Sequence, residues 1–157
     1  GFSDGGNTAM VLALRYPNKV RSLLLNGANA DPSGVVLRWR ILTRLGDWLL
    51  LLFAQFSDAA GYKRDIIHLM VNQPRLTSIN LSAIHTPTLV VVGQRDMIKA
   101  AHSQMIVRNI QHADLITVRG AGHYVAQSHP EEFNRISLDF FSKVDAGMMN
   151  QDLPEPN

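Results

Sequence analysis

Three short apolar runs, each followed by a glycine, constrain the fold of this chain more than any other feature. They extend from Val20 to Leu25, from Thr88 to Val92 and from Leu115 to Val118, and they are followed by Gly27, Gly93 and Gly120. Runs of this length are typical of strands that a parallel sheet buries on both faces. Segments with helical periodicity lie before, between and after these runs, at residues 5–16, 100–110 and 130–144. The alternation predicts an α/β fold with parallel strands flanked by helices.

A different pattern fills residues 31–80, where the sequence has no strand pattern. Leucine-rich helical segments are predicted at residues 35–45, 46–56 and 59–71. An all-helical insertion between two strands is typical of a cap or lid over an active site. Four aromatic residues of this segment could line an apolar substrate pocket, or could form the core of the cap itself: Trp39, Trp48, Phe53 and Phe56.

These patterns divide the chain into three parts. We expect an α/β core made of residues 1–30 and 81–144, a helical cap made of residues 31–80, and a tail at residues 145–157. The tail contains Pro154 and Pro156 and is predicted to be disordered.

The composition excludes several classes of function. With 46% hydrophobic and 18% charged residues, the chain is globular rather than disordered, and its 157 residues suit one domain. A net charge of only +2 argues against a nucleic-acid partner. The longest apolar run, from Trp48 to Phe53, is far shorter than the roughly 20 residues that cross a bilayer, so no membrane partner is expected. The expected location is the cytoplasm.

Cysteine and histidine usage narrows the chemistry. The chain has no cysteine, which excludes disulfides and thiolate catalysis. No pair of its six histidines combines a metal-ligand spacing with supporting carboxylates. We therefore expect no metal and no other cofactor, and a small-molecule substrate as the main partner.

The first residues carry the clearest chemical motif. Gly1-Phe2-Ser3-Asp4-Gly5 matches the pattern G-x-S-x-G, in which a sharp turn from strand to helix exposes a serine hydroxyl at the carboxyl end of a strand. The helix that starts there presents free N–H groups to developing negative charge, and the Asp4 N–H is a natural oxyanion donor.

Two further residues follow predicted strands in the same way. Asp96 comes just after the run that ends at Val92, and His123 follows Gly122 after the run that ends at Val118. The carboxyl ends of parallel strands meet at one edge of a sheet, where ligands gather. The order serine, aspartate, histidine along the chain predicts a catalytic triad of Ser3, Asp96 and His123.

Together these motifs resemble the α/β-hydrolase superfamily, in particular its small cap-bearing serine hydrolases. The resemblance covers nearly the whole chain and rests on GFSDGG, on TPTLVVVGQRD and on GAGHYVAQSHPEEF. It implies that Ser3 is the nucleophile, His123 the general base and Asp96 the residue that orients the imidazole. Asp31 is a second candidate for the acid, because some members carry the carboxylate after the preceding strand. Esterases, lactonases, C–C bond hydrolases and cofactor-free peroxidases share this elbow, and the sequence does not separate them.

The resemblance also implies that the chain is the C-terminal part of the fold, from the elbow onward. The strand before Gly1 and the loop with the second oxyanion donor would then be missing. The strand from Val20 to Leu25 would become an exposed edge, through which two copies could pair. Two functions are therefore expected: a serine hydrolase acting on a small, fairly apolar ester or related acyl compound, or a weakly active or inactive fragment with an assembly role or none.

Overall fold

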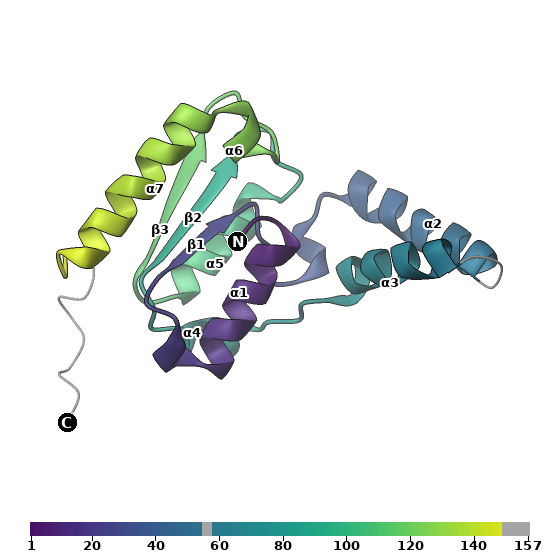
Figure 1. The fold of residues 1–157 in the computed structure, drawn as a ribbon, viewed down its shortest axis with the longest axis horizontal. Helices are drawn as coiled ribbons and strands as arrows, with labels where there is room; N and C mark the ends of the chain where they lie inside the picture. The colour runs from purple at the N-terminus through teal and green to yellow at the C-terminus, as the bar shows by residue number, and fades with distance from the viewer. Residues whose placement is uncertain (55–57, 149–157) are drawn as a thin grey trace.

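The computed structural model describes residues 1–54 and 58–148, with side chains 52–54 and 58 left aside. Its centre is a sheet of three parallel strands in the order β1-β2-β3 (Figure 1). The strands are β1 (Leu23–Asn26), β2 (Thr88–Gly93) and β3 (Ala113–Val118). The predicted α/β fold with parallel strands flanked by helices is confirmed.

Helices cover both faces of the sheet, and β2 shows how the sequence directs this. Val90 and Val92 pack on one face, against a cluster that includes residues of α1 (Asp4–Arg15) and α5 (Ala100–Asn109). Leu89 and Val91 pack on the other face. That face carries α6 (Val125–Ser128) and α7 (Pro130–Asp145). Every residue of β2 is buried, which explains its uninterrupted apolar run.

The first strand differs from its predicted bounds. Residues 17–19 form the short 3-10 helix η1 (Pro17–Lys19), and Val20 closes it. The strand therefore begins at Leu23 and continues one residue past Leu25. Proline at the first position of η1 favours this turn, because its fixed φ suits the start of a helix.

The outer edge of β1 is partly covered by the chain itself. The Gly1 amino group donates to the Leu24 carbonyl at 2.7 Å, and the Asn26 N–H donates to the Gly1 carbonyl at 2.9 Å. The Ser3 N–H donates to the Asn26 carbonyl at 2.8 Å. The edge that could accept a second copy is therefore shorter than the sequence suggested.

Residues 31–80 contain helices and no strand among the described residues. They comprise η2 (Pro32–Gly34), α2 (Leu37–Ala54), α3 (Asp58–Asn72) and α4 (Ser78–Ser82). Helices α2 and α3 lie side by side and extend away from the sheet (Figure 1). The prediction of two helices over residues 35–56 was wrong, because α2 continues through Gly46. A Cβ at this position would lie 4.0 Å from Ile67, so the glycine lies at the contact with α3.

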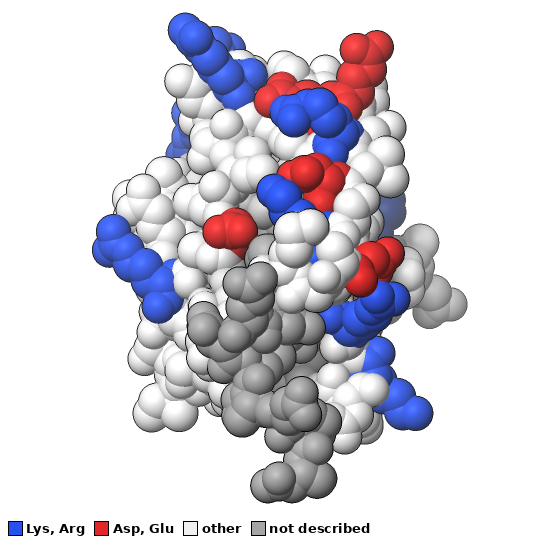
Figure 2. All heavy atoms as spheres, turned by 90° about the vertical axis from the view of Figure 1, so that its left-hand side faces the viewer, with Lys and Arg blue, Asp and Glu red and all other residues white. Residues whose placement is uncertain are grey.

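The remaining features of the fold concern helix hydrophobicity, surface charge and the end of the last helix. Within the described residues, no helix combines the length and apolar character needed to cross a membrane. On the face that Figure 2 shows, basic and acidic side chains are interspersed. Helix α7 continues to Asp145, one residue into the predicted tail, and residues 149–157 of that tail lie outside the described residues.

Candidate active site

Ser3 occupies a strained turn between extended backbone and helix. Phe2 pairs with Asn26 in a parallel bridge, and α1 begins immediately afterwards at Asp4. To make this change of direction, Ser3 adopts φ 50° and ψ −119°, and it is the non-glycine residue with positive φ among those described. Such a conformation costs about 1–3 kcal/mol and persists where the surrounding structure enforces it. The predicted nucleophile elbow is thus present as a backbone conformation.

The Ser3 hydroxyl lies at one end of a chain of three polar side chains. His123 Nε2 lies 3.0 Å from Ser3 Oγ, and His123 Nδ1 lies 2.7 Å from Asp96 Oδ1. An ionised carboxylate can only accept hydrogen bonds, so Nδ1 must carry the proton of the neutral ring. Nε2 is then free to accept the serine proton. The structure therefore brings together the three residues that the strand ends suggested.

Asp96 is held as an anion. Its side chain is 2% exposed, and that of His123 is 10% exposed. Burial by itself raises the pKa of the Asp96 carboxyl, but hydrogen bonds from His123 and from the Ile98 and Gly93 N–H groups outweigh it. The pKa of Asp96 lies below its ordinary value, so the carboxyl is ionised at neutral pH.

Asp31, the second candidate for the acid, has another partner. Its carboxylate accepts a hydrogen bond from the Ser33 N–H at 2.7 Å and caps η2. Burial raises its pKa, but the hydrogen bond from the Ser33 N–H and the charge of Arg75 bring the net pKa below the ordinary value. Asp31 thus carries a local hydrogen bond in the loop after β1, whereas Asp96 contacts His123.

The first turn of α1 offers one donor near Ser3. The N–H groups of Gly5, Gly6 and Asn7 donate to the carbonyls of Phe2 and Ser3. The Asp4 N–H has no carbonyl four residues earlier to bond, and no other partner among the described residues. It is therefore available to an oxygen that develops negative charge beside Ser3.

Gly27, directly after β1, allows His123 its position. It has φ 62°, and a Cβ there would lie 2.8 Å from His123 Cε1 and 2.9 Å from Nδ1. The same Cβ would lie 3.4 Å from Asp96 Oδ2. A side chain at this position would therefore be disfavoured by the positive φ of the backbone and would also collide with the imidazole.

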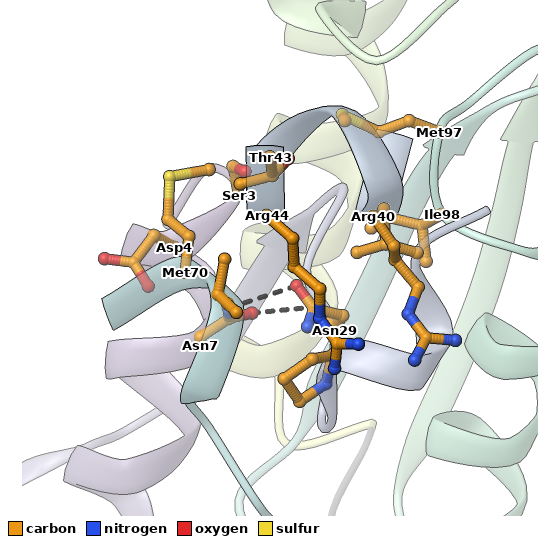
Figure 3. A pocket seen from close by; sticks show the side chains of 13 residues that line it. Ser3, Asp4, Asn7, Asn29, Arg40, Thr43, Arg44, Met70, Met97 and Ile98 are labelled. Carbon is orange, nitrogen blue, oxygen red and sulfur yellow. Dashed lines mark hydrogen bonds between the residues drawn. The ribbon is translucent and has the colours of Figure 1, made fainter. Parts of the chain in front are cut away.

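A pocket of about 50 Å³ opens beside Ser3, and residues of both α2 and α3 line it (Figure 3). Its polar lining residues are Ser3, Asp4, Asn7, Asn29, Arg40, Thr43 and Arg44. Its apolar lining residues are Pro32, Val35, Met70, Val71, Met97 and Ile98. The pocket therefore combines an apolar wall with two guanidinium groups from α2.

The aromatic candidates of the cap do not line this pocket. Trp39 is 39% exposed and Trp48 is 59% exposed, so these two are not a buried cap core either. The side chains of Phe53 and Phe56 lie outside the described residues. Arg40 and Arg44, which the sequence reasoning missed, lie on the same helix; their spacing of four residues on one helical face was the available signal.

Two buried asparagines, also missed, join α1 to the loop after β1. Asn7 Nδ2 donates to Asn29 Oδ1 at 3.1 Å, and the Asn29 N–H donates to Asn7 Oδ1 at 2.8 Å. Asn29 Nδ2 donates to the Asp31 carbonyl at 3.1 Å. The amide groups of this pair are therefore largely satisfied by each other and by the backbone, and they fix the floor of the pocket.

The start of α2 is attached to the loop that contains Asp96. The Val36 N–H donates to the Met97 carbonyl at 2.9 Å, and the Lys99 N–H donates to the Gly34 carbonyl at 2.8 Å. His102 Nε2 accepts from the Ala30 N–H at 3.1 Å. Burial lowers the pKa of His102, so its ring is neutral and can accept this bond. These contacts hold the pocket residues of α2 next to the triad.

Helices on both faces of a parallel sheet, with polar groups at its carboxyl edge, define an α/β architecture built around a strand-end site. The model of the "Alpha/beta hydrolase family" matches residues 1–136, and the chain belongs to this family. Within the described residues, no group of three or more His, Asp or Glu side chains could hold a metal ion.

Several relatives with curated names are hydrolases. Serine hydrolase BPHL of Homo sapiens is 25% identical over 153 residues, which cover 89% of this chain and 53% of that protein. The 2-hydroxymuconate semialdehyde hydrolase of Pseudomonas putida is 27% identical over 176 residues, covering 93% of this chain and 62% of that protein. The chain thus spans about half to three fifths of these relatives.

A solved structure shows the same fold. The meta-cleavage product hydrolase of Pseudomonas fluorescens superposes with a TM-score of 0.65 at 20% identity, covering 91% of this chain and 63% of that one. At this identity the likeness concerns the fold alone.

Proposed function

We propose that this chain is the part of a serine hydrolase that carries the catalytic triad, with Ser3 as nucleophile. The observation that carries the proposal is the continuous contact from Ser3 Oγ through His123 to the ionised Asp96 carboxylate. Family membership supports it, because the relatives are named hydrolases.

The geometry suits acyl transfer in two stages. His123 Nε2 takes the hydroxyl proton as Ser3 Oγ attacks the substrate carbonyl carbon, and the Asp96 carboxylate stabilises the resulting imidazolium. The Asp4 N–H donates to the developing oxyanion. The imidazolium protonates the leaving group, and a covalent acyl-serine remains. Water, deprotonated by His123, then releases the acid and restores the serine.

We propose a small ester or related acyl compound as the substrate. A cavity of about 50 Å³ with an apolar wall suits a short acyl group. The relatives' names do not agree on one substrate. We therefore infer from them only the class of reaction for this chain, and no particular compound. The helices α2 and α3 would act as a cap that limits what reaches Ser3.

Labelling with a fluorophosphonate probe tests the proposal. We expect one covalent adduct on Ser3, detected by mass spectrometry, and none in Ser3→Ala, because only a serine activated by a neighbouring imidazole reacts readily. Circular dichroism of both proteins provides the control for folding. Absence of an adduct on well-folded protein would contradict the proposal and favour the alternative, a chain with an assembly role or none.

Gly27→Ala tests whether the tight contact around His123 matters for this reaction. The methyl group would displace the ring by several tenths of an ångström, so we expect phosphonylation of Ser3 to slow by about 10²-fold. The strained φ should also destabilise the protein by about 1–3 kcal/mol. Gly147→Ala is the matched control, because Gly147 has φ 73° but nothing within 4 Å of a Cβ. It should lower the free energy of unfolding without slowing the reaction; an unchanged rate in Gly27→Ala would refute the expectation.

A further inference from the structure

The sequence led us to expect a small, fairly apolar substrate, yet two guanidinium groups line the cavity beside Ser3. Arg40 and Arg44 both come from α2, and in Figure 3 both side chains run from that helix toward the loop with Asn29. Asp4, the acidic residue of the lining, lies on the other side of the view. The pocket is therefore polarised, with its positive end formed by α2.

The other polar side chains of the pocket already have hydrogen-bond partners. Asn7 and Asn29 bond each other and the Asp31 carbonyl. The Thr43 hydroxyl donates to the Trp39 carbonyl at 2.7 Å. By contrast, neither arginine forms a salt bridge or side-chain hydrogen bond with another described residue. The unused donors of the pocket are thus concentrated on the two guanidinium groups.

This arrangement is unusual for a merely solvated face of a helix. Arg40 is partly buried, and a cation removed from water without a partner is destabilising. Arg44 and Arg38 on the same helix are both exposed, but only Arg44 lines the pocket, whereas the Arg38 guanidinium lies 6.0 Å from the Trp39 ring. A ligand with two anionic oxygens would supply the partner that the protein does not, because guanidinium and carboxylate match in charge and geometry.

We propose that Arg40 and Arg44 form a recognition site for a carboxylate, and that the substrate is an acyl compound in which a short apolar chain separates a free carboxylate from the bond that is cleaved. This inference rests on the proposed hydrolase function, because Ser3 lines the same cavity. It replaces the fairly apolar ester expected from the sequence by an anionic one. The apolar wall with Val35, Met70 and Met97 would contact the chain between the two functional groups.

Equilibrium binding tests the site without requiring turnover. Monomethyl glutarate, which carries one carboxylate, and dimethyl glutarate, its neutral counterpart, are titrated into the Ser3→Ala protein by calorimetry. We expect the acid to bind at least about 10-fold more tightly than the diester, because charge-assisted hydrogen bonds are the strong ones. Arg44→Gln should weaken acid binding by about 10-fold and Arg40→Gln by up to about 100-fold, since Arg40 is less exposed.

Matched variants separate this site from general positive charge. Arg38→Gln removes the same charge from the same helix and should leave the preference for the acid unchanged. Arg40→Lys keeps the charge but not the planar fork, and should recover only part of the affinity. Circular dichroism of each variant checks folding. Equal binding of acid and diester, or a preference that survives in the Arg40→Gln/Arg44→Gln protein, would overturn the proposal.

The outcomes of this experiment and of fluorophosphonate labelling are distinguishable. Labelled Ser3 with no preference for the acid refutes the carboxylate site and leaves the hydrolase function standing. Unlabelled Ser3 with an arginine-dependent preference refutes the hydrolase function and leaves an anion-binding pocket.

Discussion

Replacing His123 by alanine is expected to slow phosphonylation of Ser3 and hydrolysis of a small ester by about 10⁶-fold, the loss typical of a triad histidine. The reason lies in the 3.0 Å contact between His123 Nε2 and Ser3 Oγ, which no other base among the described side chains makes. A serine hydroxyl without an adjacent base is a weak nucleophile at neutral pH. The rate of probe incorporation measures the effect even where turnover is slow.

The control and a double variant sharpen this prediction. His85→Ala alters an exposed histidine that bonds Gln111 and should leave the rate unchanged. The Ser3→Ala/His123→Ala protein should hydrolyse the ester no more slowly than either single variant, because residues that act as one unit are not additive. Losses that add between the two substitutions would contradict a shared mechanism.

The positions of Ser3, Asp96 and His123 could be predicted from the sequence because short local patterns, an apolar run or a glycine-rich turn, reveal where a strand ends. Each of the three residues follows extended backbone, and parallel strands bring those ends to one edge. The apolar runs predicted β2 almost to the residue, since burial on both faces leaves little freedom in composition. The bounds of β1 were missed because Pro17 and Asn18 start a short turn that the apolar residues after it conceal.

The lining of the pocket could not be predicted in the same way. Which face of α2 lies over Ser3 depends on contacts distant in sequence, such as the bond from the Val36 N–H to the Met97 carbonyl. Apolar content made Trp39 and Trp48 the obvious candidates, while the rotation of the helix places Arg40 and Arg44 in the lining instead. Periodicity identifies the faces of a helix, and only packing decides which of them is used.

The choice between Asp96 and Asp31 is another point that the sequence left open, and a pair of substitutions decides it. Asp96→Asn is expected to lower kcat by about 10⁴-fold, because an amide can donate to Nδ1 and then favours the wrong imidazole tautomer. Asp31→Asn removes the same charge, but asparagine caps a helix about as well as aspartate, so stability and rate should both change little. Kinetics with a small ester and thermal unfolding measure the two effects. A larger loss in Asp31→Asn than in Asp96→Asn would make Asp31 the functional acid. The 2.7 Å contact between Asp96 and His123 would then serve only to hold the ring in place. A carboxylate that assists catalysis must also keep the proton on His123 Nδ1, so that Nε2 can accept the serine proton.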